Sequence, residues 1–395
     1  GCLAHPCQEV CPKGAISFVE GKSFIDQDKC IKCGKCISVC PYNSIQRMER
    51  PCAKACGMDA ITSDEHGRAE INQDKCVSCG QCLVNCPFGA IADKAQIFQV
   101  IQAIKSDKPV YAAIAPAITG QFGPDLPPNK IKSAFKALGF KDAIEVAIGA
   151  DLCTVQEAAD FIDEVPEKQP FMATSCCPAW SMMAKKLFPE EAKCISMALT
   201  PMVLTGRMLK DKEPDCYVAF IGPCAAKKLE ASRRTIRSDI DFVLTFEEVM
   251  GMFKAKDINF KELPEDRSMH GASGDGRGFA VSGGVATAVA NVLKEKYPER
   301  EVKMASAEGL AECRKLLAAA KAGKYDGYLL EGMACPGGCV AGAGTLQPIK
   351  KSQAAINLQK KNSTSAHASA SDYIEYLPTL EEKYNTMKAE LKKEY

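Results

Sequence analysis

Cysteine spacing is the feature that most constrains this chain. The run Cys-x2-Cys-x2-Cys-x3-Cys-Pro occurs twice, over residues 30–41 and 76–87. Thiolates at these spacings are typical ligands of cubane iron–sulfur clusters. The chain has 22 cysteines in 395 residues, whereas disulfide-rich secreted domains are usually short. We therefore predict two 4Fe4S clusters in a reducing cytoplasm, with two small zinc sites as the alternative.

The two runs belong to an internal repeat, which makes residues 1–95 resemble a bacterial ferredoxin. In two-cluster ferredoxins, the fourth cysteine of each run ligates the other cluster. The simplest assignment for one cluster is Cys30, Cys33, Cys36 and Cys86. The second cluster then has the ligands Cys76, Cys79, Cys82 and Cys40. Each half also begins with a Cys-x3-Cys pair, so Cys11 and Cys56 are alternative fourth ligands and the choice stays open.

Further cysteines lie outside the two runs. The spacing of Cys2, Cys7 and Cys11 resembles the end of a longer cysteine run, so we expect the natural chain to continue upstream of Gly1. A third cluster is one interpretation of these extra cysteines, and a structural role is the other. The residues concerned are Cys2, Cys7, Cys11, Cys52 and Cys56. Buried structural thiols are expected at Cys153, Cys194, Cys216 and Cys313.

Three apolar stretches farther along the chain lead directly into cysteine. Residues 171–175, 217–221 and 325–330 are predicted to be buried strands. Ligands of parallel sheets bind beyond the carboxyl ends of the strands, so the three following loops are expected to converge. Together they offer four thiolates, the number that a cubane needs, from Cys177, Cys224, Cys335 and Cys339. A zinc site and a disulfide are the alternatives.

These loops read TSCCPAW, PCAAKK and EGMACPGGC, and through them residues 109–348 resemble the iron–iron (FeFe) hydrogenases, in particular a divergent group B type. The resemblance implies a two-lobed α/β catalytic domain, with parallel sheets flanked by helices and the cofactor between the lobes. An α+β ferredoxin-like domain with two 4Fe4S clusters would precede it. The expected division is 1–95 for the ferredoxin-like part, 96–230 and 231–350 for the lobes, and 351–395 for a linker and C-terminal helix.

The resemblance also implies a cofactor and an activity. The cofactor is an H-cluster, in which Cys339 bridges the cubane to a diiron unit with carbon monoxide, cyanide and a dithiolate bridge. The activity is reversible interconversion of protons and electrons with dihydrogen. A ferredoxin or similar carrier would exchange electrons through the amino-terminal clusters, and maturation proteins would supply the diiron unit. Two alternatives stay open, namely a low-turnover hydrogen sensor and an iron–sulfur carrier or assembly protein without a diiron unit.

The resemblance further assigns a proton path. Cys176 is implied as the terminal proton donor, which suits a thiol because its pKa responds to its surroundings. Glu157, Ser196 and Asp160 are implied as the relay to solvent. Glu157 and Asp160 are three residues apart and share one helix face, so a solvated acidic face is the competing interpretation, chiefly for Asp160.

Other residues are implied to contact the diiron unit. Lys227 would donate to a cyanide ligand, whereas Lys228 is expected to pair with a surface carboxylate. The remaining implied contacts are Ala115, Pro116, Ala117, Phe279 and Met333. The chain departs from the family at Ala117, which lacks a hydroxyl, and at Met202, which replaces a polar residue. It departs again at Gly222, where loss of a methionine is expected to leave space or admit water, and in the longer loop 342–348.

Composition excludes two further classes of function. The formal net charge is +1, so nothing predicts a nucleic-acid partner, and no stretch of 18 apolar residues predicts a membrane span. Patterning predicts helices over 93–108, 129–138 and 154–163, and strands over 109–115 and 143–147. Residues 351–372 are expected to form a linker, and residues from 373 onward an amphipathic helix.

Overall fold

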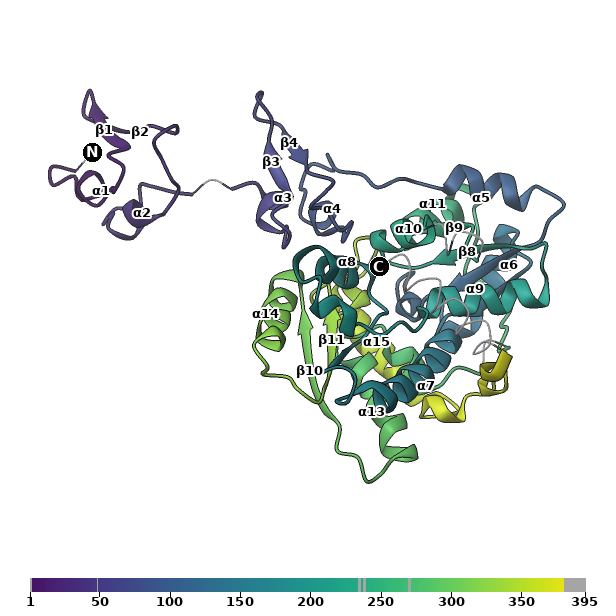
Figure 1. Cartoon of the computed structure of the whole chain (residues 1–395). Coiled ribbons are helices and arrows are strands. Elements are labelled where there is room, and N and C mark those ends of the chain that lie inside the picture. The colour runs from purple at the N-terminus through teal and green to yellow at the C-terminus, as the bar shows by residue number, and fades with distance from the viewer. Residues whose placement is uncertain (1, 48, 234–235, 237–238, 269–270, 380–395) are drawn as a thin grey trace. The chain divides into compact units, whose positions relative to one another are not determined.

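The computed structural model describes residues 2–47, 49–233, 236, 239–268 and 271–379. The chain forms two compact units, Gly1–Lys54 and Ala55–Tyr395 (Figure 1). The ferredoxin-like part therefore does not form one compact domain over 1–95 as expected, since the unit boundary falls inside it. Residues 55–95 belong to the unit that contains the catalytic lobes.

The same short module occurs twice in the amino-terminal part of the chain. In the first unit, β1 (Ile16–Val19) and β2 (Lys22–Ile25) form an antiparallel hairpin, accompanied by α1 (Pro6–Glu9) and α2 (Lys35–Ser38). In the second repeat, α3 (Pro51–Lys54) is the last element of the first unit, and the hairpin of β3 (Ile61–Ser63) and β4 (Ala69–Ile71) with α4 (Gln81–Val84) begins the second unit. Gly34 and Gly80 precede α2 and α4 with φ of 77° and 80°, a left-handed conformation that glycine adopts without strain.

The first lobe is built on a parallel sheet of order β6-β5-β8-β9. Its strands are β5 (Val110–Ile114), β6 (Asp142–Glu145), β8 (Tyr217–Ile221) and β9 (Phe242–Leu244). Helices α5 (Ile97–Ile104), α6 (Pro128–Leu138), α7 (Ala147–Glu164), α9 (Pro201–Lys212) and α11 (Phe246–Ala255) accompany it. As predicted, α6 ends at Gly139, whose φ is 110°. Helix α7 begins earlier than predicted because β6 already ends at Glu145.

The second lobe is built on a parallel sheet of order β10-β11-β7. Its strands are β10 (Lys303–Glu308), β11 (Tyr328–Met333) and the two-residue β7 (Met172–Ala173). Strand β11 starts later than predicted, because Gly327 has φ of 80° and makes a turn. Helices α8 (Pro178–Leu187), α13 (Gly284–Lys296) and α14 (Leu310–Lys321) complete this lobe.

The lobes are interleaved in sequence. Strand β7 precedes residue 230 and joins the second sheet, whereas β9 follows residue 231 and joins the first. A division of the lobes at 230/231 is therefore wrong. Parallel strands need long crossover connections, so a sheet can recruit a strand from a distant part of the chain.

The carboxyl-terminal segment corrects another expectation. Residues 351–361 lie in helix α15 (Ile349–Lys361) rather than in a linker, and Ser352 and Ile356 are buried. The short helices η4 (Ala368–Ala370) and η5 (Ile374–Tyr376) follow. Most of the C-terminal helix expected from residue 373 lies outside the described residues. No helix in the described part of the chain is long and apolar enough to span a bilayer.

Candidate active site

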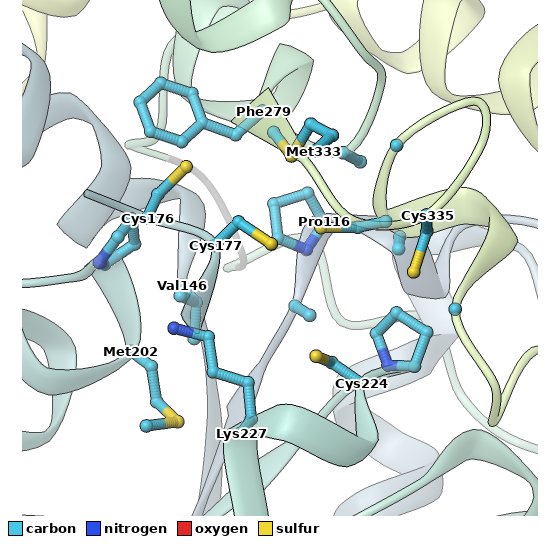
Figure 2. A pocket seen from close by; sticks show the side chains of 18 of the residues that line it. Pro116, Val146, Cys176, Cys177, Met202, Cys224, Lys227, Phe279, Met333 and Cys335 are labelled. Carbon is cyan, nitrogen blue, oxygen red and sulfur yellow. The ribbon is translucent and has the colours of Figure 1, made fainter. Parts of the chain in front are cut away.

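The three cysteine-bearing loops meet in one pocket, as the parallel-strand rule predicts. Cys177 and Cys224 directly precede α8 and α10 (Ala225–Ala231), beyond the carboxyl ends of β7 and β8. Cys335 follows β11, and Cys339 opens the short helix η3 (Cys339–Ala341). A cavity of about 90 Å³ lies between these loops (Figure 2). Its walls include all four thiols together with Ala115, Pro116, Ala117, Cys176, Met202, Phe220, Lys227, Phe279 and Met333.

The four thiols are poor sites for isolated negative charge. Burial, followed by the neighbouring thiolates, raises the pKa of Cys339 to about 12 and that of Cys224 to about 11. Burial and the same neighbours hold the pKa of Cys335 well above its ordinary value. No three His, Cys, Asp or Glu side chains among the described residues are placed to hold one metal ion. The wider frame of four mutually repelling thiolates fits a polynuclear cationic cluster such as a cubane.

Cys176 and Cys177 point in different directions despite being adjacent. Figure 2 shows the sulfur of Cys176 directed towards Phe279, whereas that of Cys177 is directed towards the middle of the pocket. Burial, reinforced by Glu157, holds the pKa of Cys176 well above its ordinary value, which favours the protonated thiol. Cys176 is therefore placed to hold a proton beside the pocket rather than to join the four other thiols.

Glu157 on α7 is hydrogen-bonded to Ser175, the residue before Cys176. Its Oε1 atom accepts from the backbone N–H of Ser175 at 3.1 Å and lies 3.2 Å from the Ser175 hydroxyl. Burial raises the pKa of Glu157 to about 7, even though hydrogen bonds from Ser175 and Ser196 oppose the shift. Asp160 is half-buried one turn farther along α7, and its charge also raises the pKa of Glu157. The structure thus brings Ser196 and Asp160 close to Glu157, and Glu157 close to Cys176.

Sequence analysis missed Ser175, although it lies inside the TSCCPAW stretch. Its hydroxyl is also 2.9 Å from the carbonyl oxygen of Ala198, so the side chain is fixed on both sides. The TSCCPAW motif, which identified the neighbouring cysteines, is the signal that could have identified Ser175 as well.

Lys227 is held by a partner that the sequence did not reveal. Its Nζ atom lies 2.6 Å from Glu230, one turn later on α10, and Glu230 is 2% exposed. The Thr200 hydroxyl donates to the other oxygen of Glu230 at 2.8 Å. Burial alone would lower the pKa of Lys227, but the Glu230 carboxylate outweighs it and the pKa lies above its ordinary value. Lys227 therefore keeps its charge inside the pocket.

Two side-chain expectations need correction. The space expected at Gly222 is occupied, because a Cβ atom there would lie 2.5 Å from the ring of Phe220, which itself lines the cavity. Lys228 pairs with Asp93 at 2.8 Å and Glu248 at 3.0 Å, but the Lys228 and Glu248 side chains are each only 10% exposed. The expected pairing with a carboxylate is present, and of the two partners Asp93 is 31% exposed whereas Glu248 is largely buried rather than on the surface.

In the second unit, four cysteines of the amino-terminal part gather around one point. Thiolate charges at Cys56, Cys76 and Cys82 all raise the pKa of Cys79, after burial, to about 12. Backbone N–H groups point at two of these sulfurs, from Ala60 to Cys56 at 3.3 Å and from Ser78 to Cys76 at 3.4 Å. This geometry matches the pairing in which Cys56 is the fourth ligand.

The first unit repeats the backbone arrangement. The N–H of Ala15 points at the sulfur of Cys11 at 3.3 Å, as Ala60 does at Cys56. Thiolate charges at Cys30 and Cys33 raise the pKa of Cys36, after burial. The equivalent geometry supports Cys11 as the partner of Cys30, Cys33 and Cys36.

Strand β11, which leads to Cys335, contains a glycine packed against the chain's single tryptophan. A Cβ atom on Gly332 would lie 2.2 Å from the fully buried ring of Trp180, whose indole N–H donates to Thr174. We expect Gly332→Ala to lower the free energy of unfolding by about 3 kcal/mol, because overpacking a rigid core costs this much. Urea denaturation followed by Trp180 fluorescence measures the change. Gly251→Ala is the control, since its added Cβ meets no neighbouring atom. Equal transitions for the two variants would contradict the packing argument.

Comparison with known proteins identifies the family. Residues 108–343, more than half of the chain, match the family described as iron only hydrogenase large subunit, C-terminal domain. The chain belongs to this family. Residues 2–50 and 46–97 each match the LdpA Fe-S cluster-binding domain, which agrees with the two repeated modules.

Individual relatives include two hydrogenases. Iron hydrogenase 1 of Clostridium pasteurianum is 29% identical over 403 residues, covering 88% of this chain and 70% of that protein. The NADP-reducing hydrogenase subunit HndD of Solidesulfovibrio fructosivorans is 28% identical over 376 residues, covering 81% of this chain and 63% of that subunit. The chain thus spans less than two thirds of HndD.

Other relatives and structures complete the picture. The cytosolic Fe-S cluster assembly factor NAR1 of Kluyveromyces lactis is 29% identical over 187 residues, covering 44% of this chain and 39% of that protein. A solved variant of apo [FeFe]-hydrogenase HydA1 from Chlamydomonas reinhardtii superposes with a TM-score of 0.58 at 23% identity, covering 72% of this chain and 94% of that one. The two-lobed α/β fold is therefore that of the hydrogenase catalytic domain.

Proposed function

We propose that this protein is an FeFe hydrogenase that interconverts protons and electrons with dihydrogen. The observation that carries the proposal is the meeting of four cluster-type thiols with Cys176 and Lys227 in one pocket. A plain cubane needs the four thiols, but it does not need a fifth thiol and a buried cation. We propose a cytoplasmic protein that exchanges electrons with a ferredoxin-type carrier and receives its diiron unit from maturation proteins.

The residues present fit an H-cluster. Cys177, Cys224, Cys335 and Cys339 would hold the cubane, and Lys227 would donate to an anionic ligand of the diiron unit. When bound, this group supplies reversible electron transfer to protons. The apolar residues Ala117, Met202, Phe279 and Met333 would exclude water from it. Fixed donors in a dry pocket act more strongly than they do in water.

Protons would move between the pocket and solvent through side chains of this chain. Cys176 would hold the innermost proton, and Glu157 would exchange with it across the Ser175 and Ser196 hydroxyls. Glu157 has a pKa of about 7, which lets it both accept and release a proton near neutral pH. Asp160, which is half-buried, would complete the path to solvent.

Infrared spectroscopy tests the proposal directly. Anaerobically purified protein is loaded with a synthetic diiron cofactor and examined in the carbonyl and cyanide stretching region, alongside hydrogen evolution from a reduced dye. Sharp bands of both kinds with turnover would support a hydrogenase. Full iron loading without such bands would favour the second candidate, an iron–sulfur assembly protein, which the similarity to NAR1 over 44% of the chain brings into consideration.

The relay makes a pH prediction. Because burial raises the pKa of Glu157 to about 7, hydrogen evolution is expected to fall as pH rises above 7, where the protonated relay is lost. The same shift makes stability depend on pH, because Glu157 binds its proton more tightly in the folded chain than in the unfolded chain. This contribution to stability is fully present below the ordinary carboxyl pKa and is lost as pH rises through 7. We expect Glu157→Gln to lower turnover at least about 100-fold and to remove this limb of the pH–rate profile. Asp163→Asn, exposed on the same helix, should keep both rate and limb. A limb that persists in Glu157→Gln would remove Glu157 from the path.

A further inference from the structure

We propose that Lys186 and Arg314, two cations of the second lobe, fix the cluster-binding loops of residues 55–82, and that Lys186 sets the reduction potential of the cluster held there. The cluster is the one that Cys56, Cys76, Cys79 and Cys82 would hold, where backbone N–H groups point at the sulfurs of Cys56 and Cys76. This inference rests only on the iron–sulfur part of the proposed function, and it does not require that the protein turn over hydrogen.

Lys186, in the last turn of α8, contacts the segment that leads into Cys76. Its ammonium donates to the backbone carbonyls of Gln73 and Asp74, and to that of Cys76 itself at 3.0 Å. All three acceptors belong to one turn of the cluster module. The ammonium charge of Lys186 is therefore hydrogen-bonded to the backbone of a proposed cluster ligand, Cys76.

Arg314, on α14, contacts the other side of the module. Its Nη1 atom donates to the carbonyl of Gly57, next to Cys56, at 3.1 Å, and lies 3.2 Å from a carboxylate oxygen of Asp59. Gly57 also packs closely on α14, since a Cβ atom there would lie 2.7 Å from the Cβ of Leu310. The cluster-binding loops are thus attached to α8 by the hydrogen bond from Lys186 to Cys76, and to α14 by the hydrogen bond from Arg314 to Gly57.

Shared packing makes this attachment rigid. Met58, Ala60 and Val77 of the module are buried in the same hydrophobic core as Trp180 and Met183 of the second lobe. A Cβ atom on Gly80 would lie 2.6 Å from the Cβ of Ala343, in the loop after Cys339. Close packing of this kind leaves the module no freedom to slide, so the two cations stay at fixed distances from the cluster site.

The two cations differ in how much of their charge reaches the cluster. Arg314 has a carboxylate partner in Asp59, which offsets part of its field. Lys186 makes its hydrogen bonds to carbonyl oxygens, and no ion pair with a carboxylate is found for it among the described residues. Reduction adds negative charge to a cluster, and a nearby cation stabilises that charge in a partly buried setting. Lys186 should therefore favour the reduced cluster more strongly than Arg314 does.

The reduction potential of this cluster would affect electron transfer to the central four-thiol site, because the two sites are neighbours. A Cβ atom on Gly80, the residue after Cys79, would lie 3.2 Å from the Cβ of Ala225, the residue after Cys224, so the module approaches the central four-thiol site here. Electrons that pass between the two sites meet a cluster whose reduction Lys186 makes easier. Lys186 would therefore stabilise the reduced state of the cluster next to the pocket.

The test is a redox titration of the iron-loaded full chain, followed by electron paramagnetic resonance of the reduced cluster. At the midpoint potential of the natural protein, we expect Lys186→Gln to lower the ratio of reduced to oxidised cluster about tenfold, equal to 59 mV for one electron. Lys186→Arg keeps the charge and should stay within about twofold. Arg314→Gln should change the ratio by less than Lys186→Gln. Lys315→Gln, on the same helix as Arg314 and paired with Glu312, should leave it unchanged.

A second variant keeps the proposal testable if Lys186→Gln cannot retain its cluster. Gln73→Glu leaves the contacts of Lys186 in place and adds a carboxylate to an exposed neighbour, so it should lower the same ratio. Unchanged midpoints in Lys186→Gln, or in Gln73→Glu where the first variant loses iron, would overturn the role of Lys186. A hydrogenase assay is not part of this readout, so failure of the proposed activity would leave the titration interpretable.

Discussion

Replacing Cys176 with alanine is expected to abolish hydrogen evolution, with a loss of at least about a thousandfold, while the iron content stays that of the natural protein. Cys176 holds its proton beside the pocket because burial and Glu157 keep its pKa well above its ordinary value. A positioned proton donor contributes about 10²–10⁴-fold to a rate, and here the bulk solvent cannot replace it inside an apolar pocket. Gas chromatography of evolved hydrogen with a reduced dye measures the loss.

The matched control for this variant is Cys194→Ala, which removes another buried thiol without touching the pocket. It should retain most of the activity. Turnover in Cys176→Ala at more than about a tenth of the natural rate would show that protons reach the diiron unit by another route, and the proposed path would have to be abandoned.

Replacing Cys224 with alanine is expected to prevent assembly of the central cluster. Cys224 is the one thiol of the four that the first sheet supplies, since Cys177, Cys335 and Cys339 follow strands of the second. A cubane needs four ligands, and the apolar lining of the pocket offers little water to replace the missing one. We expect one cubane less iron per chain and no carbonyl or cyanide bands after treatment with the synthetic cofactor.

Cys216→Ala serves as the comparison, because Cys216 is buried just before the same strand β8 but lies at its opposite end. It should load iron normally. Normal iron content together with full infrared bands in Cys224→Ala would mean that Cys224 is not a ligand, and the four-thiol assignment would fail.

The convergence of the site was predictable from sequence because it follows from a rule about backbone. Each loop comes directly after an apolar strand, and parallel strands present their carboxyl ends at one edge. The rule holds even for β7, which is only two residues long. Its parallel pairing with β11 fixes the position at which the loop with Ser175 and Cys176 leaves the sheet. Hydrophobic pattern plus cysteine position was sufficient information for this step.

What the sequence could not reveal depends on packing between distant segments. A small residue at Gly222 predicts a vacancy, but only the fold shows that Phe220, two residues earlier at the end of β8, turns its ring into that space. The burial of Glu230 beside Lys227 depends likewise on how α9 and α10 meet, through Thr200. Such contacts carry no local sequence pattern, because either residue would be unremarkable on a solvated helix.

The choice between the two cysteine pairings was beyond sequence analysis for a related reason. Both pairings satisfy the spacing of a ferredoxin run, so ligand chemistry alone cannot separate them. The turn at Ser78 and Gly80, with φ of 53° and 80°, aims the thiols of the second run at Cys56 within its own repeat. That preference is a property of three-dimensional backbone geometry and not of composition.

The interleaved lobes have a consequence for how the protein matures in the cell. A shared cluster would link three thiols that follow strands of one sheet to a single thiol that follows a strand of the other, in addition to the buried core that the two lobes already share. We expect iron supply to control the last step of compaction, and limited proteolysis of iron-depleted chains should find the region around Cys224 open. Chains that have not received iron would then be degraded more readily than loaded chains.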